Sequence, residues 1–192
     1  YHQANQAYLD DSLIFLRNIS MAYDEGRLIG FSLADSVSSP IPRMEENQVV
    51  MLGGIGCIDT EYRRLGLFSR LASLASGGRE TVLDGVDRVL ACARIAHPAS
   101  FRTLRRLPSV VPNNDSPLSD WHLEVGEAIA KLYGVKLKPS SLVVQGSGSP
   151  IGYPNINLDV STEEWIPFSD VNRDEGDSLL GIAWSPTAPK GW

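Results

Sequence analysis

The spacing of apolar positions changes several times along the first third of the chain. Leu9, Leu13 and Leu16 recur at helical intervals, which predicts a helix over residues 7–17. Residues 19–23 and 28–36 are strand-like and flank the short turn Asp24-Glu25-Gly26, a pattern typical of a β-hairpin. Residues 38–47 contain two prolines and predict a loop.

The next segment, residues 48–58, is nearly uncharged and apolar on both faces, which predicts a central strand. It contains Gly53-Gly54-Ile55-Gly56, and glycines inside a strand mark a bulge or the close approach of a ligand or another backbone. After a turn at residues 59–64, a helix is expected from Gly66 to Asp84, with Gly85 as its stop. Gly77-Gly78 should weaken that helix midway.

The remaining pattern predicts strands at 86–93, 142–145 and 178–184, a short helix at 98–107, and a clear helix at 120–133 capped by Ser119 and ended by Gly134. Residues 146–150 are rich in glycine and serine. We therefore expect one domain over residues 1–192: an α/β fold with a mixed sheet and a central βαβ unit.

Composition narrows the function classes. The chain has 192 residues, of which 43% are hydrophobic and 21% charged, as in soluble globular proteins. Its net charge of −6 argues against a generic nucleic-acid binder. Two cysteines in apolar runs indicate a reducing compartment, so we expect a cytoplasmic protein. We expect no membrane span, because no long apolar run occurs, and no signal peptide, because the first residues are polar. We also expect no metal.

The most informative stretch runs from Ile58 to Leu67. A buried strand leads into a turn with Arg63, Arg64 and Gly66, and then directly into a helix. The free amides and the dipole of a helix N-terminus attract anions, and the arginines add charge and donors. Residues 61–107 carry nine arginines against four acids. The pattern favours a phosphate or diphosphate ligand; the alternative is a solvated turn that only caps the helix.

This stretch resembles motif A of the GNAT acyltransferase superfamily. The matching residues are Ile58-Asp59-Thr60-Glu61-Tyr62 followed by Arg63-Arg64-Leu65-Gly66-Leu67-Phe68. The hairpin before it is similar to the family's second and third strands, and residues 97–107 to its later strand-to-helix region. The resemblance covers residues 19–107. Phe68 departs from the family pattern, since Gly or Ala is usual at that position. Residues 108–192 match nothing in the family; they are predicted to form a helix, strands and loops, and we consider them for the substrate side. The strand and helix expected before Ala4 are also not found.

The resemblance implies an acyl-CoA N-acyltransferase-like fold in which two parallel central strands splay apart around the donor. It implies that acetyl-CoA donates its acyl group to an amine, on a small molecule or a peptide, by direct attack on the thioester. The residues implied to bind the donor are the backbone of Gly56, Cys57 and Ile58 for the pantetheine arm and, for the diphosphate, Arg63, Arg64, Leu65, Gly66, Leu67, Phe68 and Ser69.

Candidates for the proton transfers are few. His97 is placed to act as a base, and its alternative role is to cap the helix at Pro98. Tyr133 and Tyr153 are candidate acids only if the C-terminal part folds over the cleft. The sequence therefore leaves three hypotheses: an N-acyltransferase, a catalytically inactive GNAT-like module that binds CoA or a protein partner, and a structural domain. A homodimer is the oligomer considered.

Overall fold

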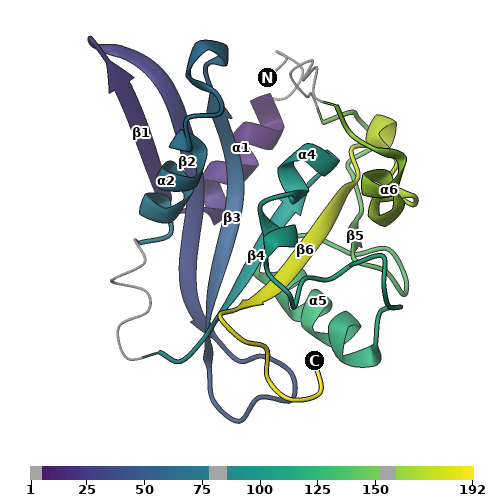
Figure 1. Cartoon of the computed structure of the whole chain (residues 1–192). Helices are drawn as coiled ribbons and strands as arrows, with labels where there is room; N and C mark the ends of the chain where they lie inside the picture. Colours follow the sequence, from purple (N-terminus) through teal and green to yellow (C-terminus); the bar gives the residue numbers. More distant parts are fainter. Residues whose placement is uncertain (1–5, 78–85, 152–158) are drawn as a thin grey trace.

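The computed structural model describes residues 6–77, 86–151 and 159–192, and they form one mixed sheet with helices on both faces (Figure 1). The strands are β1 (Asn18–Asp24), β2 (Arg27–Ser39), β3 (Gln48–Ile58), β4 (Val89–Ile95), β5 (Val143–Val144) and β6 (Ser178–Ser185). The α-helices are α1 (Gln6–Phe15), α2 (Leu67–Ala75), α4 (Pro98–Phe101), α5 (Asp120–Leu132) and α6 (Thr162–Trp165). Short 3-10 turns are η2 (Thr60–Tyr62), η3 (Leu104–Arg106), η4 (Ile166–Phe168) and η5 (Arg173–Glu175).

The six strands follow the order β1-β2-β3-β4-β6-β5. The β3–β4 pair is parallel, and every other neighbouring pair is antiparallel. The predicted hairpin is β1–β2, and the predicted βαβ unit is β3-α2-β4. The prediction of a mixed α/β sheet is thereby confirmed. Because β6 pairs with every residue of β4, the C-terminal part of the chain belongs to the same sheet.

The two faces of the sheet carry different helices. On one face, Leu16, which follows α1, and Val125 and Ile129 of α5 pack with Leu52 of β3 and Ile182 of β6 in the larger core cluster. On the other face, Phe101 and Leu104 from the α4–η3 segment pack with Ile95 and Ala183. Helix α2 lies on this second face, where the hydroxyl of Ser20 donates to the carbonyl of Leu71 at 2.6 Å.

Several predicted boundaries need correction. The helix expected over 98–107 is two pieces, α4 and η3, and Phe101 and Leu104 both pack in the core cluster on this face. Helix α2 ends at Ala75, followed by Gly77 at φ +92°, and the predicted continuation to Gly85 falls on residues 78–85, outside the described part. The strand expected at 86–93 is β4 at 89–95, the one at 142–145 is only β5, and β2 extends beyond 36 to Ser39.

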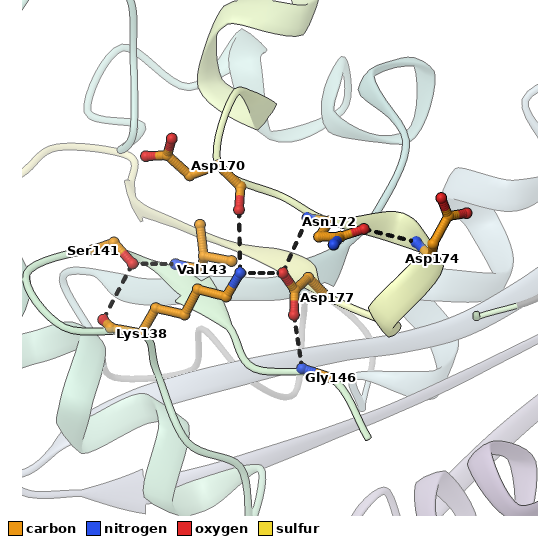
Figure 2. A network of polar contacts seen from close by, with 8 residues as sticks. All are labelled: Lys138, Ser141, Val143, Gly146, Asp170, Asn172, Asp174 and Asp177. Carbon is orange, nitrogen blue, oxygen red and sulfur yellow. Dashed lines mark hydrogen bonds and ion pairs between the residues drawn. The ribbon is translucent and has the colours of Figure 1, made fainter. Parts of the chain in front are cut away.

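A buried carboxylate holds together the loops beside β5 and β6 (Figure 2). Asp177 pairs with the ammonium of Lys138 and accepts the amides of Gly146 at 2.9 Å and Asn172 at 3.0 Å. Burial alone would raise the pKa of Asp177, but these three donors outweigh burial and hold that pKa below its usual value. The network thus ties three separate segments of the C-terminal part to one point.

Among the helices that the structure describes, none combines the length and the hydrophobicity needed to cross a bilayer.

Candidate active-site cleft

The two central strands are paired over only part of their length. The parallel β3–β4 ladder runs from Val49↔Val89 to Gly53↔Ala93, although β3 continues to Ile58 and β4 to Ile95. Beyond Gly53, β4 therefore no longer pairs with β3. The strands splay at this point, as the resemblance predicts.

A β-bulge in β3 lies at the start of this fork. Ser32 of β2 pairs with Gly56 and Ala34 pairs with Gly53, so Leu33 stands opposite two residues, Gly54 and Ile55. The bulge thus lies within the glycine-rich run 53–56, where the sequence predicts a bulge or a close approach. Gly54 is needed there, since a Cβ on it would lie 1.9 Å from Cδ1 of Leu16 and 3.1 Å from the carbonyl oxygen of Leu33.

A cavity of about 620 Å³ opens at the fork. Its lining includes residues of α2 and of the α4–η3 segment, the two pieces that flank β3 and β4 in front of the sheet in Figure 1. Small residues keep it open, because no large side chain rises from these positions: Gly53, Gly56, Ala72, Ala91, Ala93 and Ala99. In the sequence, the alternation of Ala91 and Ala93 along one face of a buried strand was the signal for this floor.

All three residues implied to bind the pantetheine arm, Gly56, Cys57 and Ile58, line this cavity. Cys57 is half-buried, whereas Cys92 on β4 is buried, and burial raises the pKa of its thiol. The ring of Phe68 lies against Gly56: a Cβ on Gly56 would come within 2.3 Å of Cε2 of that ring. Phe68 also lines the cavity, so it covers part of the β3 backbone without closing the fork.

The turn before α2 has the backbone expected of an anion site. Gly66, at φ +74°, caps α2 and offers no side chain to the amides of the first turn. By contrast, the side chains of His97, Ser119 and Ser161 cap α4, α5 and α6. Arg63 donates from Nε to the carbonyl of Ile58 at 3.1 Å and lines the cavity.

The other turn residues stand apart from the cavity. Of the seven residues implied to cradle the diphosphate, only Arg63 and Phe68 line it; Arg64, Leu65, Gly66, Leu67 and Ser69 do not. Arg64 lies at φ +68°, an unusual conformation for a residue with a side chain. The turn at residues 63–69 therefore touches the cavity only through Arg63 and Phe68, and we call it the rim of the cavity.

His97 has the alternative role weighed from the sequence. Its Nδ1 accepts the amide of Ala99 at 3.2 Å and caps α4, while its ring meets Trp165 edge-on at 5.5 Å. Burial, with smaller effects from Arg173 and Arg102, lowers the pKa of His97. His97 is not among the residues that line the cavity.

Of the two tyrosines considered as acids, Tyr153 lies outside the described residues. Tyr133 is buried at the end of α5, and its hydroxyl contacts the carbonyls of Gly53 at 2.8 Å and Cys92 at 3.1 Å. Gly53 belongs to the last rung of the β3–β4 ladder, Gly53↔Ala93, and Cys92 to the rung before it, Leu52↔Cys92. Tyr133 therefore reaches the end of the ladder from the α5 face without lining the cavity.

The cavity is poor in acid–base groups. Among the described residues that line it there is no Asp, Glu, His, Lys or Tyr; its charged members are Arg63 and Arg94. Ser178, which the sequence did not single out, also lines it, and its buried Oγ has no hydrogen-bond partner in the described part of the chain. Over the same residues, no cluster of side chains suited to a metal ion is found.

Comparison with known proteins gives structural likeness only. No protein-family model matches the chain, and no curated protein matches it. A solved acetyltransferase from Vibrio fischeri is similar over 47% of this chain and 69% of its own, with 20% identity and a TM-score of 0.31. Diaminobutyrate acetyltransferase EctA from Paenibacillus lautus, solved with L-2,4-diaminobutyric acid and coenzyme A, is similar over 92% and 72%, with 17% identity and a TM-score of 0.33.

Naa20 from Chaetomium thermophilum, solved with a bisubstrate analogue, is similar over 95% of this chain and 83% of its own, with 12% identity and a TM-score of 0.40. The fold itself is defined by the strand order, the parallel β3–β4 pair and the fork between these two strands.

Proposed function

We propose that this protein is an acyl-CoA-dependent N-acyltransferase. The observation that carries the proposal is the fork: β3 and β4 part after Gly53 and Ala93, and a cavity of about 620 Å³ opens beside the part of β3 that β4 no longer accompanies. Such a backbone can pair with an extended amide-containing ligand as it would with a strand. The pantetheine arm of CoA is a ligand of this kind.

The rim of the cavity supplies a place for the diphosphate. The first-turn amides of α2 have no side-chain cap, and Arg63, three residues before the cap Gly66, lines the cavity. A helix N-terminus and an arginine are the groups that bind phosphate in many proteins. A CoA molecule held at this rim would run its thioester end along Gly56 toward the fork.

Acyl transfer at this site would depend mainly on positioning. The amine nitrogen attacks the thioester carbonyl, the C–S bond breaks, and the proton lost by the amine ends on the departing thiolate. Holding the amine and the thioester together supplies much of the rate, and backbone amides near the β3 bulge would stabilise the oxyanion. A lysine-like amine has a pKa of about 10.4 in water, so its ammonium form must lose a proton before the attack. That proton passes to water or to another group of the acceptor molecule.

One observation favours the second candidate, a module that binds CoA without turnover. The described residues lining the cavity include no side chain that serves as a base at neutral pH, and Phe68 covers Gly56. Binding then needs only the fork and the rim, whereas turnover also needs a route for the proton.

Calorimetric titration with acetyl-CoA tests the donor site. Arg63→Ala and Gly66→Glu should each weaken binding at least tenfold, because they remove a donor or place a negative charge where phosphate lies. Arg43→Ala is the matched control, since Arg43 is an exposed arginine paired with Glu124. Absence of heat with the unmodified protein would remove both candidates.

A thiol-release assay separates the two candidates. The assay measures the rate at which free CoA thiol appears when the protein is mixed with acetyl-CoA and each member of a panel of small amines and peptides. For an enzyme, this rate rises with the concentration of an amine that it accepts. Binding of acetyl-CoA together with silence across the whole panel would favour the module. The proposal includes acetyl as the acyl group, an amine of a small molecule or a peptide as the acceptor, and a cytoplasmic location. The two free cysteines agree with a reducing compartment such as the cytoplasm.

A further inference from the structure

The hydroxyl of Tyr133 lies at a point that the proposed chemistry does not use. It contacts one carbonyl of β3, at Gly53, and one of β4, at Cys92. Because one hydroxyl reaches both, the two carbonyl oxygens face the same space between the strands. These residues lie at the end of the ladder, immediately before the fork.

We propose that Tyr133 is a positioning residue whose hydroxyl pins the last two rungs of the β3–β4 ladder, through Gly53 of β3 and Cys92 of β4, and so fixes where the fork opens. The end of a ladder frays when nothing beyond it holds the strands in place. A single buried group bonded to both strands ties that end to α5. The opening of the cavity then starts at one defined residue pair.

Helix α5 is a firm support for this contact. Its N-terminus carries a reciprocal cap between Ser119 and His122, and its buried residues Val125 and Ile129 belong to the larger core cluster. Tyr133 follows directly at the C-terminus, where its own amide bonds to the carbonyl of Ile129. The phenol ring is therefore held at its base by the helix and at its tip by the two strands.

The consequence for ligand binding rests on the proposed function. A ligand that pairs with β3 beyond Gly53 needs that backbone to be already free and ordered. If the end of the ladder shifts or frays, the ligand must order it on binding, which weakens affinity. Tyr133 thus contributes to donor binding without touching the donor.

Amide hydrogen exchange tests the pinning by a measurement that needs no ligand. In Tyr133→Phe, the amides of residues 53–55 and 93–94 should exchange at least fivefold faster than in the unmodified protein. Ser109→Ala is the matched control, because Ser109 also makes two backbone contacts through one hydroxyl, to Trp184 at 2.8 and 2.9 Å, away from the fork. In the control, exchange should rise near Trp184 and stay unchanged at the fork.

Wild-type exchange at the fork in Tyr133→Phe, or an equal rise in the Ser109→Ala protein, would overturn the proposal. Replacing Tyr133 with 4-aminophenylalanine restores a donor at the same place and should return exchange at the fork to the wild-type rate; a failure of this rescue also counts against pinning.

A second arm measures acetyl-CoA affinity, which should fall about tenfold in Tyr133→Phe and less than twofold in Ser109→Ala. If the unmodified protein binds no acetyl-CoA, the proposed function fails, and the exchange result still decides the role of Tyr133. Unchanged affinity with faster exchange at the fork would overturn the link to binding.

Discussion

At the scale of single residues, Phe68 controls how much of β3 a ligand reaches. Its ring lies on Gly56, where the resemblance places the pantetheine arm, and its side chain is 39% exposed. The ring thus has open space into which it can turn. The anion turn keeps its backbone form although a large side chain stands where a small one is usual, because Phe68 points toward β3.

We predict that Phe68→Ala binds acetyl-CoA several-fold more tightly than the unmodified protein, because the ring no longer has to move off Gly56. Calorimetric titration measures the change. Leu74→Ala is the control: Leu74 is an exposed apolar residue of the same helix and does not line the cavity. Weaker binding in Phe68→Ala would mean that the ring contacts the ligand rather than obstructs it.

At the scale of elements, the start of α2 depends on two residues with positive φ. Gly66 is at +74° and Arg64 at +68°. A Cβ on Gly66 would meet no atom within 4 Å, so only the backbone conformation requires glycine there. This makes the turn a clean place to measure conformational strain without a packing effect.

We predict that Gly66→Ala lowers the free energy of unfolding by about 1 kcal/mol, the usual cost of the left-handed conformation for a residue with a Cβ. Arg64→Gly should remain within about 0.5 kcal/mol of the unmodified protein, since relief of strain and the added freedom of the unfolded chain oppose each other. Urea unfolding measures both changes. A loss in Arg64→Gly as large as that in Gly66→Ala would contradict this explanation.

At the scale of the whole molecule, buried or paired carboxylates join distant segments to the sheet. Asp177 joins three segments of the C-terminal part (Figure 2). Asp35 of β2 accepts two bonds from Arg17, at 2.6 and 3.1 Å. Glu164 of α6 binds Arg102, which follows α4, at 2.6 and 2.9 Å. Each pair links parts of the chain that are far apart in sequence.

We predict that Asp177→Asn destabilises the fold by about 3 kcal/mol, because it leaves the Lys138 ammonium and the backbone amides of Gly146 and Asn172 without their carboxylate. This is the low end of the usual range, since the Lys138 side chain is 36% exposed. Asp170→Asn is the control: the interactions of Asp170 drawn in Figure 2 use only its backbone carbonyl. Thermal or urea unfolding measures the difference, and equal stability of the two variants would contradict it.

Acid should weaken the fold through the same carboxylates. For Asp35 and Asp177, burial raises the pKa, but the hydrogen bonds lower it by more, so the net pKa lies below the usual value. The hydrogen bonds from Arg102 lower the pKa of Glu164 to about 2. Folded pKa values below the unfolded ones, about 3.9 for Asp and 4.3 for Glu, give stability that is present above those pH values. That stability is lost as the pH falls through the folded pKa values.

Burial lowers the pKa of His97 and His122, so the melting temperature should begin to fall below about pH 6.5, where these histidines take up protons more readily in the unfolded chain. It should then fall further from about pH 5 toward pH 2, as the carboxylates take up protons. Asp177→Asn should show a shallower fall over the same range, because one of the responsible groups is absent. A fall that is equally steep in this variant would show that other carboxylates are responsible.

Local elements could be predicted from the sequence because their determinants lie within a few residues of each other. The strand at 48–58, the cap at Ser119 and the stop at Gly134 are all found where the pattern places them. The strand, turn and helix around Gly66 were also predictable, since the glycine adjoins an apolar strand and an amphipathic helix; binding of an anion there stays a prediction. The helix at 98–107 was wrong in its length, because the chain forms α4 and the separate turn η3 there.

The sequence by itself determined which segments form strands and helices, the glycine-rich strand and the turn that follows it, since the local spacing of apolar residues, turn residues and helix caps decides these. Only the tertiary structure decided that β3 and β4 part after Gly53, that Phe68 turns onto Gly56, and that Tyr133 joins both strands. These depend on contacts between residues up to 80 positions apart, which no local pattern encodes.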